Sequence, residues 1–137
     1  MLADELQDAI RAKLEADVAL VAAVTGIWVD VAQPDLPEAD SAFPYLTFGE
    51  DQISNWDTKT GNGASAVCQI DIWSRSNNLI EAKEIGKLVY RALHKGALTF
   101  ATAAHVSTVV ESQAYSNDPD GKTKRGITLV RVIYDEI

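Results

Sequence analysis

The chain has 137 residues, of which 47% are hydrophobic and 23% charged, with a formal net charge of −8 and one cysteine. This composition predicts a single domain over residues 1–137, large enough to form a hydrophobic core without cross-links. The negative charge argues against a general nucleic-acid-binding protein, because such a protein needs a basic surface to neutralise phosphates. No apolar segment is long enough to cross a bilayer, and the acidic N-terminus does not resemble a secretory signal.

The first part of the sequence predicts a helix, a short strand and an irregular connector. Apolar residues at three- and four-residue spacing predict an amphipathic helix over residues 4–24, which Thr25-Gly26 ends. β-Branched and aromatic residues at positions 27–31 predict a strand. Three prolines and three acids within residues 33–44 exclude regular structure there, so we expect a connector.

Two further strands are predicted in the middle of the chain, over residues 45–53 and 64–74. The polar segment 54–63 between them is either a mobile loop or the tip of a long hairpin. In the second strand, alternate residues predict one buried face and one half-buried face. Asp71 falls on the half-buried face, where we expect it to pair with Arg131 if the two strands meet.

A second amphipathic helix is predicted over residues 79–95, before Gly96, with its apolar side at Ala82, Ile85, Val89, Ala92 and Leu93. Basic residues recur every four positions on the opposite side and form a stripe: Lys83, Lys87, Arg91 and Lys95.

The rest of the chain predicts β-structure. A short piece near residues 98–101 precedes strands over 105–115 and 124–136, and the sequence of 117–121 is typical of a hairpin turn. The predicted order is α-β-β-β-α-(β)-β-β. This order indicates an α+β fold in which a mixed, mainly antiparallel sheet packs with two helices.

The residues with reactive or metal-binding side chains do not form a recognisable catalytic or metal-binding pattern. His94 and His105 are eleven residues apart, with no cysteine or acid at metal-ligand spacing, so we expect structural roles for both. Cys68 falls inside a predicted strand, excludes an internal disulfide and fits a reducing compartment. The sequence therefore assigns no catalytic, cofactor-binding or metal-binding residue, and we expect no cofactor.

Surface residues are the better candidates for function. Trp56 lies in a polar loop together with Lys59, where an exposed tryptophan is typical of a partner contact, unless the indole folds onto its own sheet. The basic cluster in the predicted 117–126 hairpin can meet an acidic neighbour or a phosphate, or can simply be solvated. The candidate interface residues are Trp56, Lys59, Lys83, Lys87, Arg91, Lys122, Lys124 and Arg125.

The charge is unevenly distributed along the chain. Residues 1–60 hold twelve acids and three bases, a net −9, whereas residues 61–137 hold eight acids and nine bases, a net +1. The two halves can pair within one molecule, present complementary surfaces to neighbouring copies, or form an uneven solvated surface.

Five segments in this order resemble tail completion or tail terminator proteins of long-tailed phages, prophages and gene transfer agents. The segments are 26–29, 43–49, 69–75, 82–85 and 125–131, and the resemblance extends over nearly the whole chain. The Pro-Tyr pair of 43–49 and the Ile-Asp-Ile-Trp-Ser run of 69–75 are its most specific parts.

The resemblance implies a structural virion protein that is not an enzyme. Members of the family assemble as a ring, commonly hexameric, which caps the head-proximal end of the tail tube and joins it to the head connector. The implied partners are further copies of the chain, the tail tube protein and the head–tail connector proteins; DNA passes through the lumen without specific binding, and no membrane is involved. Assembly is expected in the cytoplasm of the bacterial host.

Two other functions remain open from the sequence. One is a tail tube or connector subunit, which shares the fold class. The other is a small cytoplasmic ligand-binding domain or enzyme, which needs a concave site with converging polar groups.

Overall fold

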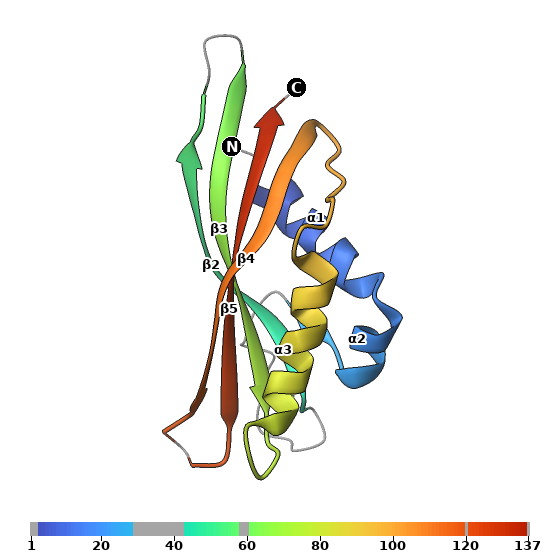
Figure 1. The fold of residues 1–137 in the computed structure, drawn as a ribbon, viewed down its shortest axis with the longest axis vertical. Helices are drawn as coiled ribbons and strands as arrows, with labels where there is room; N and C mark the ends of the chain where they lie inside the picture. The colour runs from blue at the N-terminus through green and yellow to red at the C-terminus, as the bar shows by residue number, and fades with distance from the viewer. Residues whose placement is uncertain (1–2, 29–42, 58–60, 120, 137) are drawn as a thin grey trace.

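The computed structural model describes residues 3–28, 43–57, 61–119 and 121–136, and these form a five-stranded sheet with helices on one face (Figure 1). The strand order is β1-β2-β3-β5-β4. β1 runs parallel to β2, and every other neighbouring pair is antiparallel. The strands are β1 (Ile27–Trp28), β2 (Tyr45–Asn55), β3 (Asn62–Ser74), β4 (Ala103–Asn117) and β5 (Lys124–Glu136). The predicted α+β fold with a mixed, mainly antiparallel sheet is confirmed.

The helices in the described residues are α1 (Ala3–Glu15), α2 (Val18–Ala23) and α3 (Ile80–Leu93). The prediction of one continuous N-terminal helix was therefore wrong. Asp17 has an extended backbone, with φ −85° and ψ 104°, and its side chain accepts a hydrogen bond from the Leu20 N–H at 3.1 Å. An aspartate that caps a new helix in this way competes with continuation of the preceding helix.

The break also changes which residues are buried in the second helix. Val18 and Val21, which the apolar spacing placed on the buried side, are 82% and 47% exposed, whereas Leu20 is fully buried. α2 turns away from the axis of α1. The three- and four-residue spacing of apolar residues continues through residues 14–21, so the sequence pattern gives no sign of this turn. None of the described helices combines the length and apolar character needed to cross a membrane.

The contribution of the Asp17 cap can be measured by substitution. We expect Asp17→Ala to lower the free energy of unfolding by about 1 kcal/mol, because the Leu20 N–H loses its acceptor. Asp17→Asn keeps an acceptor and should cost less. The pKa of Asp17 is lowered, first by the Leu20 N–H and also by Arg91, so its charge stabilises the fold above pH 3.8, the ordinary aspartate value. That stabilisation is lost as the pH falls through the folded-state pKa.

Urea unfolding at pH 7 and again at a pH below the lowered folded-state pKa of Asp17 gives the measurement. The difference between the native chain and Asp17→Asn should shrink at the lower pH, where both side chains are neutral. An alanine variant as stable as the native chain at pH 7 would contradict the role of the cap.

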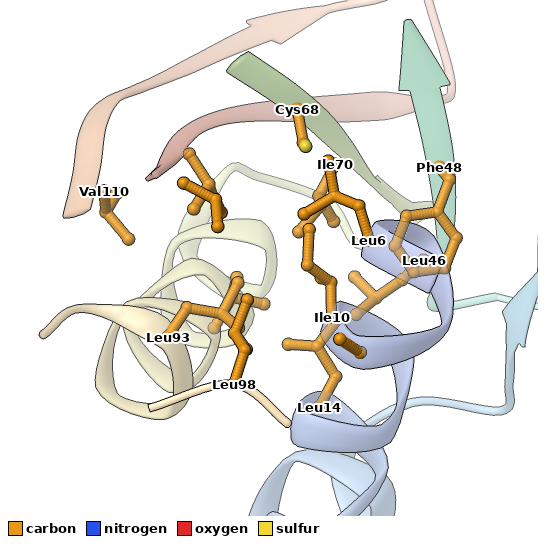
Figure 2. Packing of buried hydrophobic residues seen from close by; sticks show 14 of the residues in the cluster. Leu6, Ile10, Leu14, Leu46, Phe48, Cys68, Ile70, Leu93, Leu98 and Val110 are labelled. Carbon is orange, nitrogen blue, oxygen red and sulfur yellow. The ribbon is translucent and has the colours of Figure 1, made fainter. Parts of the chain in front are cut away.

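The core lies between the helices and one face of the sheet. Figure 2 shows Leu6 and Ile10 of α1 beside Leu46 of β2 and Ile70 of β3, and all of these side chains are almost completely buried. On β3 the predicted buried face is confirmed: Ala66, Cys68, Ile70 and Ile72 belong to this core.

Two loop predictions change in extent. β2 continues to Asn55 and β3 begins at Asn62, so the predicted loop is the short tip of a long hairpin. Segment 98–101 is not a strand, yet Leu98 is buried in the core (Figure 2). β1 ends at Trp28, and the predicted connector up to residue 42 lies outside the described residues.

The two long hairpins extend toward opposite ends of the sheet. The β2–β3 hairpin projects at one end, and the β4–β5 hairpin, with the predicted turn, lies at the other (Figure 1). In that turn Asp118 N–H donates to Thr123 O at 2.8 Å, and Gly121 adopts a φ of +74° that favours glycine.

α3 is fixed to the sheet along its whole length. Its predicted apolar side is confirmed, and Gly86 is buried beside it, where the absence of a side chain lets the helix approach Tyr115 of β4. At its C-terminal end, Lys95 N–H donates to Thr108 O at 2.8 Å, and the Val110 N–H donates to His94 Nδ1 at 3.1 Å. These two bonds join the end of α3 to β4, an edge strand of the sheet.

Candidate assembly surfaces

Both histidine side chains make hydrogen bonds within the fold. His94 accepts the hydrogen bond from Val110, and His105 Nε2 lies 2.6 Å from Thr108 Oγ1. Burial lowers the pKa of His105, with a further contribution from Lys13. Within the described ranges, no group of three or more His, Cys, Asp or Glu side chains lies close enough together to hold a metal ion.

Cys68 is 1% exposed, and burial, with the neighbouring Asp51 carboxylate, raises the pKa of its thiol. A thiolate is the reactive form, so we expect Cys68 to be unreactive in the native protein. Ellman's reagent at pH 8 should modify the native chain far more slowly than the chain unfolded in guanidinium. Ser116→Cys, at an exposed position on β4, supplies the control and should react at once with one equivalent. Equal rates for native and unfolded Cys68 would contradict its burial.

The predicted basic stripe lies on the outer side of α3. Lys83, Lys87 and Arg91 are exposed, and Ile80 and Tyr90 lie along the same stripe, at 60% and 42% exposure. Tyr90 is stacked on His94, with ring centroids 4.4 Å apart. Seven of the exposed residues of α2 and α3 are together called the α2–α3 surface: Val18, Val21, Ile80, Lys83, Lys87, Tyr90 and Arg91. Ile80 and Tyr90 were not among the predicted site residues, although each lies three residues from a stripe lysine, Ile80 before Lys83 and Tyr90 after Lys87, and this spacing would have found them.

Arg91 also has a role within the chain. Its guanidinium donates to the Asp17 carboxylate at 2.9 Å, so the N-terminus of α2 is tied to α3. This ion pair joins the acidic first part of the sequence to the basic stripe within one molecule. Arg91 is therefore already engaged in an ion pair within its own chain.

Trp56 follows β2 at the end of the projecting hairpin, and its side chain is 55% exposed. Its backbone N–H donates to Gly63 O at 2.9 Å, and Asp57 links Asn55 to the Gly63 N–H through short hydrogen bonds. The backbone around Trp56 is thus held in place while its indole remains exposed. Lys59, the other candidate in this loop, lies outside the described residues.

The three basic residues at the β4–β5 hairpin differ in exposure. Lys122 is exposed, whereas Lys124 and Arg125 are half-buried. Arg125 pairs with Asp71 at 3.3 Å, and its guanidinium carbon lies 5.0 Å from the centre of the Trp73 ring. Arg125 is therefore held by its own sheet.

The predicted pair between Asp71 and Arg131 was wrong because of strand register. β3 and β5 do pair, but Asp71 is opposite Ile127, and Arg131 is opposite Val67. Asp71 therefore meets Arg125, two residues along β5, while Arg131 bonds Glu111 and Ser65.

Comparison with known proteins identifies the family. The family model of the tail completion protein gp17 matches residues 8–135. The tail completion protein gp17 of Bacillus phage SPP1 is 28% identical over 95 residues, which cover 69% of this chain and 70% of that protein.

Solved structures agree with this match. A chain from the virion of a native gene transfer agent particle has a TM-score of 0.86, with 23% identity over 98% of this chain and 97% of that chain. The structure of bacteriophage SPP1 gp17 has a TM-score of 0.57, with 26% identity over 94% of this chain and 88% of that chain. The chain belongs to the tail completion protein gp17 family, and it is a structural component of the virion and not an enzyme.

Proposed function

We propose that the chain forms a homo-oligomeric ring, expected to be a hexamer, that caps the head-proximal end of the tail tube and joins it to the head connector. The observation that carries the proposal is the family match over residues 8–135, nearly the full length of the chain. The exposed interface candidates on α3 and at both hairpins supply surfaces for the contacts that such a ring needs.

A ring closes when one surface of a subunit fits a different surface of the next subunit and the rotation returns to the start. The α2–α3 surface suits one side of this contact, because exposed apolar side chains lie among its cations. The acidic first part of the neighbouring chain, a net −9 over residues 1–60, is the complementary side.

The tube and the connector are contacted by other parts of the molecule. The two hairpins lie at opposite ends of the sheet, so each can meet a different neighbour along the tail axis (Figure 1). Exposed Trp56 is the anchor residue at one of these ends. The net charge of −8 leaves few cations to retain phosphates, which lets DNA pass through the lumen without specific binding.

The experiment is an assembly assay with two readouts. Mass photometry and electron microscopy of the purified chain should show closed rings of about six copies, the expected number of subunits. Added to polymerising tail tube protein, the chain should stop tube growth and remain at one end of the tube. Growth that continues by incorporating the chain would instead identify a tube subunit. A monomer at high concentration with no affinity for tube ends would overturn the proposal.

A further inference from the structure

The sheet has a second face that none of the described helices covers. All three described helices lie on one side of the sheet, so the other side is left without a packed layer (Figure 1). Five apolar side chains are neighbours on this bare face, on the adjacent strands β3, β5 and β4. We call them the open-face patch: Val67, Val109, Ile127, Leu129 and Ile133.

The alternation of β5 decides which side chains point to the bare face. Val130 and Val132 are fully buried in the core, so the odd-numbered residues of β5 point to the other side. Arg131 lies opposite both Val67 of β3 and Val109 of β4, which therefore share that side. Val109 is 39% exposed, and the other four patch residues are half-buried. Contiguous apolar side chains at such exposure are typical of an interaction surface.

One end of the bare face is closed by side chains of the same chain. Trp73 stacks on Tyr45, with ring centroids 6.4 Å apart, and Arg125 lies over the Trp73 ring. Beside them, Asp71 is only 3% exposed. The open-face patch begins at Ile127, opposite Asp71, and continues away from this end. A contact surface is therefore confined to the part of the face beyond the aromatic side chains.

The charges around the open-face patch are either neutralised or negative. Arg131, at the centre of the patch, forms an ion pair with Glu111 of β4. Asp135, further along the same face of β5, is exposed. β2 borders β3 and exposes Glu50 and Asp51. These surroundings suit a partner that carries cations beside apolar groups.

The α2–α3 surface of a second copy matches the patch in size and in chemistry. From Ile127 to Ile133 the patch spans about 20 Å of β5, and its three adjacent strands are about 10 Å wide. On α3, the stretch from Ile80 to Arg91 is about 16 Å long, and a helix with its side chains is about 10 Å across. The α2–α3 surface supplies exposed apolar side chains for the patch and lysines for the carboxylates around it.

We propose that the open-face patch receives the α2–α3 surface of the next copy, so that the helices of one subunit lie on the bare sheet face of its neighbour. The two surfaces are on opposite sides of the molecule, which is the arrangement that a head-to-tail ring contact requires (Figure 1). The inference rests on the proposed ring, and it names the region of the neighbour that the α3 lysines meet. The acidic first part of the chain enters this contact through β2.

The test is a charge-reversal series followed by mass photometry over a range of concentrations. Val109→Lys with Ser112→Lys puts two cations on the bare face, at exposed positions of β4. In the proposed contact these cations face Lys83 and Lys87, so the apparent dissociation constant of the ring should rise at least about tenfold. Val109→Glu with Ser112→Glu is the matched control, because it removes the same valine with the opposite charge, and it should retain rings. Circular dichroism and thermal unfolding confirm that each variant is folded.

Combining both reversals in one chain tests whether the two surfaces meet. A chain with Val109→Lys, Ser112→Lys, Lys83→Glu and Lys87→Glu places opposite charges across the contact again. It should associate at least about tenfold more tightly than the sum of the two losses predicts. Strictly additive losses would show that the surfaces do not meet and would overturn the inference.

The remaining outcomes separate this inference from the proposed function. Rings of native stability in the lysine variant would overturn the inference and leave the proposed ring standing. If those rings no longer bound tube ends, the patch would belong to the tail tube protein, which also overturns the inference. A native chain that stays monomeric at every concentration would overturn both.

Discussion

Replacing Lys83 and Lys87 together by glutamate is expected to abolish ring formation. Both side chains are exposed on α3 and lie on the α2–α3 surface, and in the proposed ring the reversal puts like charges opposite the acidic part of the next subunit. Such a mismatch costs about 3 kcal/mol, which corresponds to about a hundredfold loss in association constant. Mass photometry over a range of concentrations should show monomers where the native chain shows rings.

The Lys122→Glu and Lys124→Glu pair is the control for this prediction, because it alters net charge by the same amount on another surface. It should retain the ring. Tyr90→Ala tests the apolar part of the α2–α3 surface without any change of charge, and it should weaken association as well. Rings of native mass and stability in the α3 double variant would show that this surface is not the subunit contact.

Gly86→Ala is expected to lower the free energy of unfolding by about 2 kcal/mol, despite the usual advantage of alanine over glycine in a helix. A Cβ atom at this position would lie 2.0 Å from the hydroxyl oxygen of Tyr115, far inside van der Waals contact. Either α3 must move off the sheet or the tyrosine must leave its place. Chemical denaturation monitored by circular dichroism measures the loss.

Removing the hydroxyl should relieve most of this cost. In Tyr115→Phe the nearest remaining ring atoms would lie 3.0 and 3.2 Å from the new Cβ, a crowded but tolerable distance. The Gly86→Ala, Tyr115→Phe double variant should therefore be more stable than the sum of the two single effects predicts. Strictly additive effects would show that the two side chains do not meet.

Periodicity predicted the parts of the fold that depend on neighbours in sequence. The buried side of α3 and the alternation of β3 both follow from spacing of apolar residues, and both are confirmed. The hairpin turn at 117–121 follows from local turn chemistry and is confirmed as well. The prediction of an exposed basic stripe on α3 succeeded for the same reason.

The predictions that failed depend on geometry that a sequence does not show. The partner of Asp71 is decided by the register between β3 and β5, and a shift of a few residues exchanges Arg131 for Arg125. The cleft lined by Phe43, Arg75 and Lys122 depends on three segments that are far apart in sequence, so Arg75 could not be associated with Lys122 in advance. At Asp17, the side-chain hydrogen bond to the Leu20 N–H starts a new helix, although the apolar spacing predicts that the first helix continues.

The attachment of α3 to β4 has a consequence for a protein made in many copies. An edge strand of fifteen residues is a potential template on which other chains can add in register and grow into insoluble fibrils. Here the His94 and Lys95 bonds occupy backbone groups of Val110 and Thr108, near the middle of that strand. A foreign strand therefore finds one donor and one acceptor near the middle of this edge already occupied, which hinders its addition there.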